Sequence, residues 1–315
     1  MSAHRILVTC PPMLGMLEAF VAPAQELGLE LVPAEVTQTL SEAELIELLP
    51  QFDGWIIGDD PATQQVFEAG KRGSLKAAVK WGIGVDNVDF KACEALGIPI
   101  INTPGMFGGE VADVAVGYVI ALARHTVEID RGVRAGSWPK PRGLSLAGRT
   151  VAVLGYGDIG RNTARRLLAA DMAVIAYDPF VDPSSLEAGV SLAAWPERLG
   201  EADFVVVNCA LTASSHHMLN AAAFAAMNPG VRVVNVGRGP VIDEQALIAA
   251  LASGQVHSAA LDVFEQEPLP LDSPLRSHQA CIFGSHNASN TVDGVERTSH
   301  KAIQLLAEFL QEPTA

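Results

Sequence analysis

Apolar residues fall in short runs that alternate with stretches of helical spacing along most of the chain. In the first third these runs lie beside Gly or Pro and cover residues 6–9, 30–32, 55–57, 77–79 and 98–101. Such runs predict strands. A helical stretch follows the first run through Glu26, and Ser41 before Glu42 and Glu44 predicts the N-cap of another helix. Strands that alternate with helices indicate a parallel sheet covered on both faces.

The same alternation is stronger from Thr150 onward. Six apolar runs predict strands at residues 151–154, 173–177, 204–208, 232–236, 259–261 and 281–283. Helices are expected between most of them, at residues 160–170, 221–227 and 243–252. Two sets of strands in a chain of 315 residues predict two domains.

Two longer helical patterns lie outside these sets. Residues 110–124 are apolar nearly all round, so we expect a buried helix at the junction of two lobes. Residues 292–310 follow the last predicted strand, and we expect this helix to return and pack against the first lobe.

A glycine-rich turn follows the strand predicted at residues 151–154. Residues 155–160 read GYGDIG, the pattern G-x-G-x-x-G between a strand and a helix. Gly155 permits a tight turn, Gly157 lets the backbone approach a pyrophosphate, and Gly160 lets the helix pack on the strand. Asp178 lies 23 positions after Gly155, where a carboxylate accepts both ribose hydroxyls of NAD and repels the 2′-phosphate of NADP. An ordinary strand–helix turn is the alternative, but the context favours an NAD site.

Composition narrows the classes of partner. Hydrophobic residues make up 49% and charged residues 18%, which suits a globular protein with a large core and excludes disorder. The 36 acidic and 21 basic residues give a net charge of −15, which argues against nucleic acid or an anionic membrane as the main partner. The four cysteines have no CxxC spacing, so we expect no metal site and no disulfide framework, but reduced thiols in a cytoplasmic protein. No stretch approaches the length of a membrane span, and the first apolar run is too short for a signal peptide.

Three predicted strands of the second half each lead to a residue that can do chemistry. These residues are Arg238, Glu267 and His286. Ligands of open α/β sheets bind outside the carboxyl ends of the strands, so the three side chains can converge there. Arg binds a carboxylate bidentately, and His exchanges a proton near neutral pH. A carboxylate against the second ring nitrogen fixes the tautomer and favours imidazolium. Beside a nicotinamide, such a set describes oxidation of a 2-hydroxy acid to a 2-oxo acid.

Each of these residues also has an ordinary structural role open to it. Arg238 can be a surface cation at a helix end, Glu267 a solvated turn acid, and His286 a core or capping histidine. Spacing alone does not choose between these roles and catalysis.

The chain closely resembles the D-isomer-specific 2-hydroxyacid dehydrogenase family, and within it the D-3-phosphoglycerate dehydrogenase branch, over essentially its whole length. The matching segments, in order and at family-like spacing, are GIGVDNVD at 82–89, NTPG at 102–105, GYGDIG at 155–160, VGRGP at 236–240, LDVF at 261–264, Glu267-Pro268 and Ser285-His286. The resemblance implies that Arg238 binds the substrate carboxylate, that His286 is the acid/base, and that Glu267 pairs with His286.

The resemblance also implies contacts to substrate and cofactor. The backbone at Gly82, Ile83 and Gly84 would hold the substrate, with Lys80 beside it. Cofactor contacts would come from Gly155, Gly157, Asp158, Ile159, Gly160, Asp178, Cys209, Val236, Gly237, Arg238, Asp262 and His286, with Ile83 near the nicotinamide. Asp262 would accept a hydrogen bond from the carboxamide, the alternative being a strand-end cap.

The fold implied is α/β, with two Rossmann-like, doubly wound parallel-sheet domains and the active site in the cleft between them. A substrate-binding domain would span residues 1–102 and be completed by 290–315, and an NAD-binding domain would span 103–289. Members are usually homodimers joined through the NAD-binding domain. Residues 129–141, with Arg134 and Trp138, resemble the dimer arm, the alternative being an exposed loop.

Some segments depart from the family pattern. Asn208-Cys209-Ala210-Leu211 stand where the family has His-Thr-Pro-Leu, and we interpret Cys209 as a thiol lining the cofactor groove rather than a reactive one. Asn287-Ala288-Ser289 after His286 are bulkier than the usual glycines. The chain ends at Ala315 with no room for appended regulatory domains, so feedback control by an amino acid is not expected.

The charges near the first predicted domain's strand ends bear on the substrate. The resemblance implies first-lobe arginines for a substrate phosphate, but Gly58 stands at one such position, followed by Asp59 and Asp60. Lys80 is the retained cation. Two carboxylates would repel a phosphate, unless they point to solvent as a turn and an N-cap. We therefore expect a non-phosphorylated 2-oxo acid to be preferred over 3-phosphohydroxypyruvate.

Two other functions remain open at this point. One is a non-enzymatic, NAD-sensing binding protein of the corepressor type, which can keep the same residues. The other is a related oxidoreductase, such as a formate or phosphite dehydrogenase.

Overall fold

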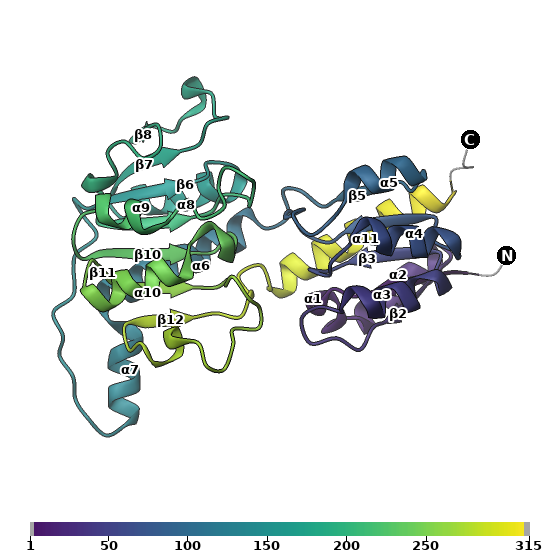
Figure 1. Ribbon diagram of the computed structural model, residues 1–315, viewed down its shortest axis with the longest axis horizontal. Helices are drawn as coiled ribbons and strands as arrows, with labels where there is room; N and C mark the ends of the chain where they lie inside the picture. Colours follow the sequence, from purple (N-terminus) through teal and green to yellow (C-terminus); the bar gives the residue numbers. More distant parts are fainter. Residues whose placement is uncertain (1–2, 312–315) are drawn as a thin grey trace. The chain divides into compact units, whose positions relative to one another are not determined.

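The computed structural model describes residues 3–311 and divides into two compact units (Figure 1). Unit 1 comprises the chain up to Phe107 together with the residues from Asn290, and unit 2 comprises Gly108–Ser289. Each unit is built on one parallel sheet, so the prediction of an α/β protein with parallel sheets is confirmed.

Unit 1 holds a five-stranded sheet in the order β2-β1-β3-β4-β5. Its strands are β1 His4–Val8, β2 Leu29–Pro33, β3 Gly54–Ile57, β4 Ala77–Lys80 and β5 Ile100–Asn102. Its helices are α1 Pro11–Leu14, α2 Glu18–Glu26, α3 Glu42–Leu48, α4 Gln64–Arg72, α5 Phe90–Leu96 and α11 Val292–Gln311. The stretch expected to be helical through Glu26 is thus two helices.

Local signals explain where the helices of unit 1 begin. Ser41 and Glu44 form a capping box. The Ser41 hydroxyl accepts from the Glu44 N–H, and the Glu44 carboxylate accepts from the Ser41 N–H. Thr63 and Asp89 are simple N-caps of α4 and α5. The side chain of each accepts a hydrogen bond from the backbone N–H three residues further along the chain. The helix α11 packs against β4, β3, α1 and α2 of unit 1, which confirms the return of the last helix to the first lobe.

Unit 2 holds a seven-stranded sheet in the order β12-β11-β10-β9-β6-β7-β8. Its strands are β6 Thr150–Leu154, β7 Ala173–Tyr177, β8 Val190–Leu192, β9 Phe204–Val207, β10 Val231–Asn235, β11 Val256–Leu261 and β12 Cys281–Phe283. Its helices are α6 Gly108–Arg124, α7 Thr126–Arg134, α8 Asp158–Leu168, α9 Ala221–Ala226 and α10 Glu244–Ser253. Short 3₁₀ turns are η1 Leu49–Gln51 in unit 1 and, in unit 2, η2 Pro183–Ser185, η3 Leu199–Glu201, η4 Gly239–Val241 and η5 Pro274–Ser277.

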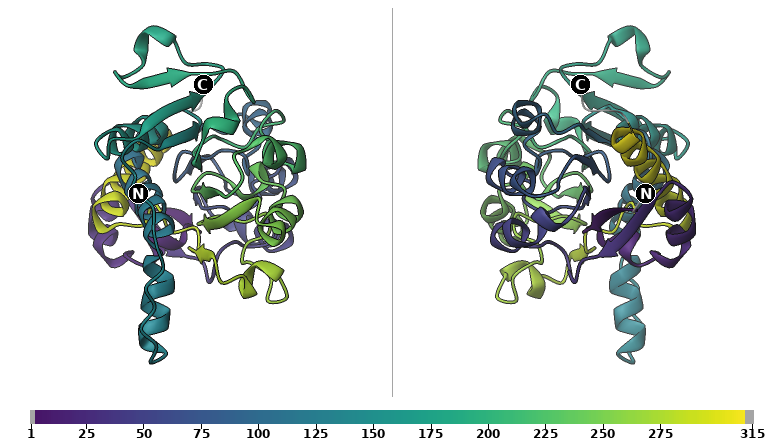
Figure 2. Two further views of the ribbon diagram at one scale, coloured as in Figure 1. Left: turned by 90° about the vertical axis from the view of Figure 1, so that its left-hand side faces the viewer. Right: turned by 90° about the vertical axis from the view of Figure 1, so that its right-hand side faces the viewer.

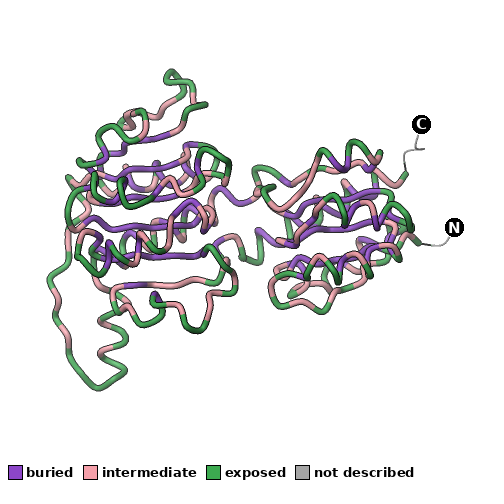
Figure 3. The backbone as a smooth tube through the Cα atoms, in the orientation of Figure 1, coloured by how far each residue is buried: buried purple, intermediate pink, exposed green. Residues whose placement is uncertain are grey.

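Helices cover both faces of the unit 2 sheet. Alternate strand residues such as Ala152, Val205 and Val233 pack with the side chains of α9 and α10, whereas α6 and α8 pack side by side against the sheet. The central strands are buried along their length (Figure 3). A parallel sheet buried on both faces explains why its strands read as continuous apolar runs.

Two predictions for unit 2 differ from the structure. The edge strand β8 is not predicted, because three half-buried residues are too short a run for an alternating pattern to indicate a strand. The helix at 110–124 is not buried all round, because α6 packs on α8, β10 and β11 while the Ile120 side chain stays 44% exposed.

The helix α7 and the segment after it project away from the rest of unit 2 (Figures 1 and 2). None of the residues of α7 is buried. None of the helices within residues 3–311 has the length and apolar character needed to cross a membrane.

Candidate active site

The carboxyl ends of the unit 2 strands lie level with one another. Leu154 is paired in register with Tyr177 and with Val207, and Asn235 is paired with Val207 and Leu261, which is paired with Phe283. The cofactor residues predicted for unit 2 lie in the glycine turn or one to three residues after the ends of these strands. Arg238 and His286 also lie within three residues of a strand end. Strand register therefore brings them to one edge of one sheet, as the sequence predicted for the catalytic and cofactor sets.

The glycine turn after β6 has the geometry that each glycine was expected to supply. Gly155 has a φ of +86°, and a Cβ there would lie 2.6 Å from the Cα of Cys209. A Cβ on Gly160 would lie 2.0 Å from the carbonyl oxygen of Gly155, so the helix packs directly on the turn. Only glycine fits these two positions.

Gly157, unlike Gly155 and Gly160, borders open space. A Cβ there would meet no atom of the described residues within 4 Å. Gly157 is the N-cap of α8 and, as a glycine, has no side chain to cap the first N–H groups of that helix. Asp158 is exposed and Ile159 half-buried in its first turn. An open helix N-terminus next to open space can receive a pyrophosphate.

Asp178 follows β7 directly and is held by the backbone. One carboxylate oxygen accepts from the Tyr156 N–H at 2.8 Å, and the other from the Phe180 N–H at 2.9 Å. These contacts fix the carboxylate beside the glycine turn, where a ribose diol can reach it.

The end of β9 carries an unsatisfied amide. Within residues 3–311, neither the oxygen nor the nitrogen of the buried Asn208 amide has a hydrogen-bond partner. A buried amide without partners is costly, so a polar ligand at this edge would relieve it. Next to it, burial and the Asp178 carboxylate raise the pKa of the Cys209 thiol to about 11. A thiol with that pKa stays protonated near neutral pH, in keeping with a groove-lining role rather than a reactive one.

The turn after β10 positions Arg238. The Asn235 side chain accepts from the Gly237 N–H at 3.0 Å and donates to the Arg238 carbonyl at 3.0 Å, which braces the turn. Val236 is buried, and a Cβ on Gly239 would collide with the Phe264 carbonyl. The half-buried Arg238 guanidinium donates to the Gly237 carbonyl at 3.0 Å.

Asp262 ends β11 and holds the turn that carries His286. Its carboxylate accepts from the Asn287 N–H at 3.2 Å and the Ala288 N–H at 2.9 Å, and its carbonyl accepts from the His286 N–H at 2.7 Å. The side chain is buried. The strand-end cap is therefore real, and the proposed carboxamide contact would have to share this carboxylate.

Glu267 and His286 form a tight pair. Glu267 Oε2 lies 2.7 Å from His286 Nδ1, and Oε1 accepts from the Phe264 N–H at 2.9 Å. His286 adopts a left-handed φ of 55°. A carboxylate fixed by the backbone against one ring nitrogen orients the imidazole and stabilises its protonated form.

A second acid–histidine pair, which sequence reasoning missed, lies close by. Glu265 Oε1 is 2.8 Å from His217 Nε2 and accepts from the Glu244 N–H at 3.2 Å. Burial raises the pKa of Glu244, and the Glu265 and Glu267 carboxylates add to this. The two acids Glu265 and Glu267, separated by one residue, were the one signal for this cluster in the sequence.

The residues predicted for substrate binding in unit 1 lie at the carboxyl edge of its own sheet. Ile57, Lys80 and Asn102 are paired in register at that edge, and the turn of Gly82, Ile83 and Gly84 follows. The Thr103 hydroxyl accepts from the Gly82 N–H at 2.7 Å, and the Asn102 amide donates to the Ile83 carbonyl at 3.1 Å. The Ile83 side chain is exposed.

The acids after β3, Asp59 and Asp60, neither both face the substrate region nor both point to solvent, which were the two arrangements that the sequence left open. Asp60 is fully buried, neither solvent-facing nor an N-cap, since Thr63 caps α4. Lys80 is buried as well and is ion-paired with Asp59 at 3.0 Å. The cation expected near the substrate is thus already matched by an anion.

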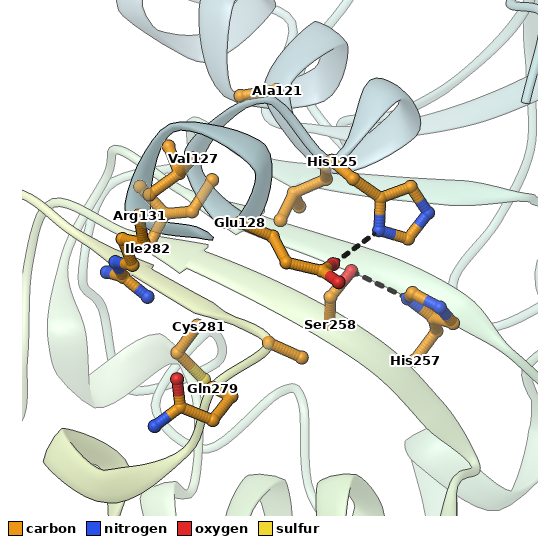
Figure 4. Close-up of a pocket in the computed structure, with 12 residues that line it drawn as sticks. Ala121, His125, Val127, Glu128, Arg131, His257, Ser258, Gln279, Cys281 and Ile282 are labelled. Carbon is orange, nitrogen blue, oxygen red and sulfur yellow. Dashed lines mark hydrogen bonds and ion pairs between the residues drawn. The ribbon is translucent and has the colours of Figure 1, made fainter. Parts of the chain in front are cut away.

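A pocket bounded by α6, α7, β11 and β12 lies elsewhere (Figure 4). Its lining includes His125, 2.8 Å from Glu128, and His257, 3.0 Å from the Ser258 hydroxyl. His257 and Cys281 stand at the beginnings of their strands, so the pocket lies at the edge of the sheet opposite His286. It does not belong to the candidate active site.

Comparison with known proteins identifies the family. Residues 116–288 match the family model described as D-isomer specific 2-hydroxyacid dehydrogenase, NAD binding domain. The chain is 35% identical to the hydroxypyruvate reductase of Thermotoga maritima over 285 residues, covering 88% of this chain and 90% of that protein. It is also 35% identical to D-3-phosphoglycerate dehydrogenase 2, chloroplastic, of Arabidopsis thaliana, over 98% of this chain and 48% of that protein. The chain spans about half the length of the curated D-3-phosphoglycerate dehydrogenases it matches.

Solved structures agree with the fold. The TT0316 protein from Thermus thermophilus is similar with a TM-score of 0.84 and 30% identity, over 98% of this chain and 97% of that one. A glyoxylate reductase from Paecilomyes thermophila is similar with a TM-score of 0.83 and 27% identity, over 99% and 97%.

The open space at Gly157, the unsatisfied Asn208 amide and the fixed Asp178 carboxylate fit a dinucleotide, and the matched model is an NAD-binding domain. The comparisons give no support to the alternative of a binding protein without turnover. Motifs, strand register and comparisons lead to one conclusion: the chain belongs to the D-isomer-specific 2-hydroxyacid dehydrogenase family.

Proposed function

We propose that the protein is an NAD-dependent D-2-hydroxyacid dehydrogenase that transfers a hydride between NAD(H) and C2 of a small 2-hydroxy or 2-oxo acid. The observation that carries the proposal is the Glu267–His286 pair at 2.7 Å, at the same sheet edge as Arg238 and the glycine turn. An acid-held histidine, an arginine fork and a dinucleotide turn together meet the chemical needs of this reaction.

NAD supplies the hydride acceptor or donor when it is bound. The residues that would hold it are the α8 N-terminus at Gly157 for the pyrophosphate and Asp178 for the ribose hydroxyls. Asp158, Ile159, Cys209, Val236, Gly237 and Asp262 would line the rest of its groove, with Ile83 of unit 1 near the nicotinamide.

His286 acts as the acid/base in this proposal. Because Nδ1 is paired with Glu267, proton exchange with the substrate oxygen falls to Nε2. In reduction the imidazolium gives its proton to the oxygen as the hydride reaches C2, and in oxidation the neutral ring takes the hydroxyl proton. Glu267 stabilises the charged ring between these events.

Arg238 binds and orients the substrate carboxylate. Its planar guanidinium can form two parallel hydrogen bonds to a carboxylate, which sets the face that C2 presents. The residues proposed for substrate binding in unit 1 are the backbone of Gly82, Ile83 and Gly84, with Lys80 behind them. On this account the two sheets keep the roles expected for them, with 103–289 binding NAD and 1–102 with 290–315 contacting the substrate.

An initial-rate screen tests the proposed function. The protein is assayed with NADH and with NADPH against glyoxylate, hydroxypyruvate, pyruvate and 3-phosphohydroxypyruvate. We expect turnover of at least one 2-oxo acid, with NADH strongly preferred because of the Asp178 carboxylate. No turnover of any 2-oxo acid by protein that binds NADH would contradict the proposal.

The assembly proposed is a homodimer formed through unit 2. Supporting it, the Trp138 side chain is 77% exposed on the arm after α7, and Val133 and Ile120 are exposed apolar residues on α7 and α6. Exposed apolar side chains on and near a projecting arm are typical of an interface. No nucleic acid or membrane partner is proposed.

The location proposed is the cytoplasm. The four cysteines are all free thiols, and three of them are buried. Free thiols suit a reducing compartment. Cell fractionation with an antibody to the chain checks this, and recovery outside the cytoplasmic fraction would contradict it.

A further inference from the structure

The strands β3 and β4 end side by side at a partly buried ion pair. Ile57 and Lys80 are paired in register as their last residues, and the turn 58–60 folds back over them. The Lys80 ammonium donates to the Gly58 carbonyl and lies 3.0 Å from the Asp59 carboxylate. The Lys80 side chain is 3% exposed and the Asp59 side chain 33%, so Asp59 is the solvent-facing member of the pair.

The turn that carries Asp59 is held firmly. The buried Asp60 carboxylate accepts from the Leu40 N–H at 2.9 Å, from the Gly58 N–H at 3.2 Å, and from the Thr9 hydroxyl. The Asn87 amide donates to the Gly58 carbonyl at 3.1 Å and to the Asp60 carbonyl at 2.7 Å. Because both ends of the turn are anchored, the backbone at Asp59 is fixed and keeps its side chain within reach of Lys80.

The pair removes the positive charge that a phosphate would need at this edge. One lysine faces one fixed carboxylate, with a second carboxylate buried behind it, so the three groups carry no net positive charge. A phosphate dianion placed here would meet Asp59 first, and partial burial strengthens the repulsion. The Gly82–Gly84 turn begins two residues after Lys80 and exposes Ile83 and, next to it, Val85, which suit an uncharged group.

We propose that the Asp59–Lys80 ion pair is a specificity-determining element that selects 2-oxo acids with a small uncharged side group and rejects phosphorylated ones. The proposal rests on the proposed function, because it assigns the carboxyl edge of the unit 1 sheet to the substrate side group. The Asp59 carboxylate then neutralises the charge of Lys80, so the effect of Lys80 on substrate choice depends on Asp59.

The test is the ratio of kcat/KM for 3-phosphohydroxypyruvate to kcat/KM for hydroxypyruvate, with NADH. In the unchanged protein the ratio is expected to be well below one. The substitution Asp59→Asn keeps the size of the side chain and unmasks Lys80, so the ratio should rise about tenfold or more. Adding Lys80→Met to Asp59→Asn should remove that gain, and Asp59→Glu should keep the original ratio.

The same sheet offers a matched control. Asp53 and Lys76 form an exposed pair at 2.8 Å just before β3 and β4, whose first residues are also paired in register. Asp53→Asn makes the same charge change at the opposite edge and should leave the ratio unchanged. Thermal melting of each variant shows that it is folded.

The possible failures are distinguishable. If the unchanged protein reduces none of the 2-oxo acids, the proposed function fails and the specificity proposal falls with it. If the protein reduces hydroxypyruvate but folded Asp59→Asn behaves like Asp53→Asn, the specificity proposal alone is overturned. A clear preference of the unchanged protein for 3-phosphohydroxypyruvate overturns it as well.

Discussion

The imidazole of His286 is placed by contacts that a solvent-exposed histidine would lack. The backbone N–H of His286 donates to the Asp262 carbonyl at 2.7 Å, and Glu267 Oε2 lies 2.7 Å from the ring Nδ1. The backbone adopts a left-handed φ of 55°, which these contacts maintain. Asp262 thus fixes the backbone that carries the ring, and Glu267 contacts the ring itself.

Glu267→Gln should move the pH dependence of reduction to lower pH. Reduction needs imidazolium, and without the carboxylate the ring loses its proton at a lower pH, so the upper limb should shift down by about one unit or more. The measurement is kcat/KM for the best 2-oxo acid across the pH range. The matched control is Glu265→Gln, whose carboxylate pairs with His217 instead. A Glu267→Gln profile that coincides with the control profile would argue against the pairing.

Arg238→Lys should separate charge from geometry. Lysine keeps the positive charge but loses the planar fork, so carboxylate binding and orientation should both suffer. We expect kcat/KM to fall about 10²-fold, with KM raised and kcat lowered. Steady-state kinetics measures this, and thermal melting shows that the variant is folded. Kinetics equal to those of the unchanged protein would remove Arg238 from the substrate site.

At the scale of elements, the glycine turn allows packing and cofactor binding to be separated. Gly160→Ala places a Cβ 2.0 Å from the Gly155 carbonyl oxygen, so it should lower the free energy of unfolding by about 1–3 kcal/mol. Gly157→Ala meets no described atom within 4 Å, so it should leave folding stability nearly unchanged and weaken NADH binding. Denaturant titration and NADH fluorescence titration measure the two effects. Unchanged NADH affinity in Gly157→Ala would contradict the pyrophosphate position.

The elements that could be predicted from sequence are those whose signal is local. The strand before Gly155, the turn itself and the Ser41 cap each depend on neighbouring residues, and the structure shows all three. The edge strand β8 has three half-buried residues and no such signal.

The parts that could not be predicted depend on contacts between distant residues. Burial of Asp60 depends on Thr9 and Leu40, and the masking of Lys80 depends on Asp59, 21 positions earlier. Neither pairing leaves a spacing pattern. For Glu267 and His286, by contrast, the predicted strand ends indicated convergence and the family resemblance implied the pairing, and the register of β11 and β12 brings the two residues together.

At the scale of the whole molecule, the exposed arm predicts a dimer. Trp138→Ala should weaken association, so that the mass of the particle falls toward that of one chain on dilution. Sedimentation or light scattering over a range of concentrations measures this. Leu271→Ala is the control, because Leu271 is a similarly exposed apolar residue of unit 2, 91% exposed, and is not one of the arm residues 129–141. If the unchanged protein is a monomer, or if both variants dimerise equally strongly, the arm does not form the dimer interface.

Hydride transfer to C2 with His286 as the proton donor can be followed with a labelled cofactor. The experiment is reduction of the best 2-oxo acid with NADH deuterated at both C4 positions, followed by chiral analysis and mass spectrometry of the product. We expect one deuterium at C2, the D configuration, and a rate lowered about 10²–10⁴-fold in His286→Ala while NADH binding persists. An unlabelled product, the L configuration, or a His286→Ala rate equal to that of the unchanged protein would contradict this mechanism.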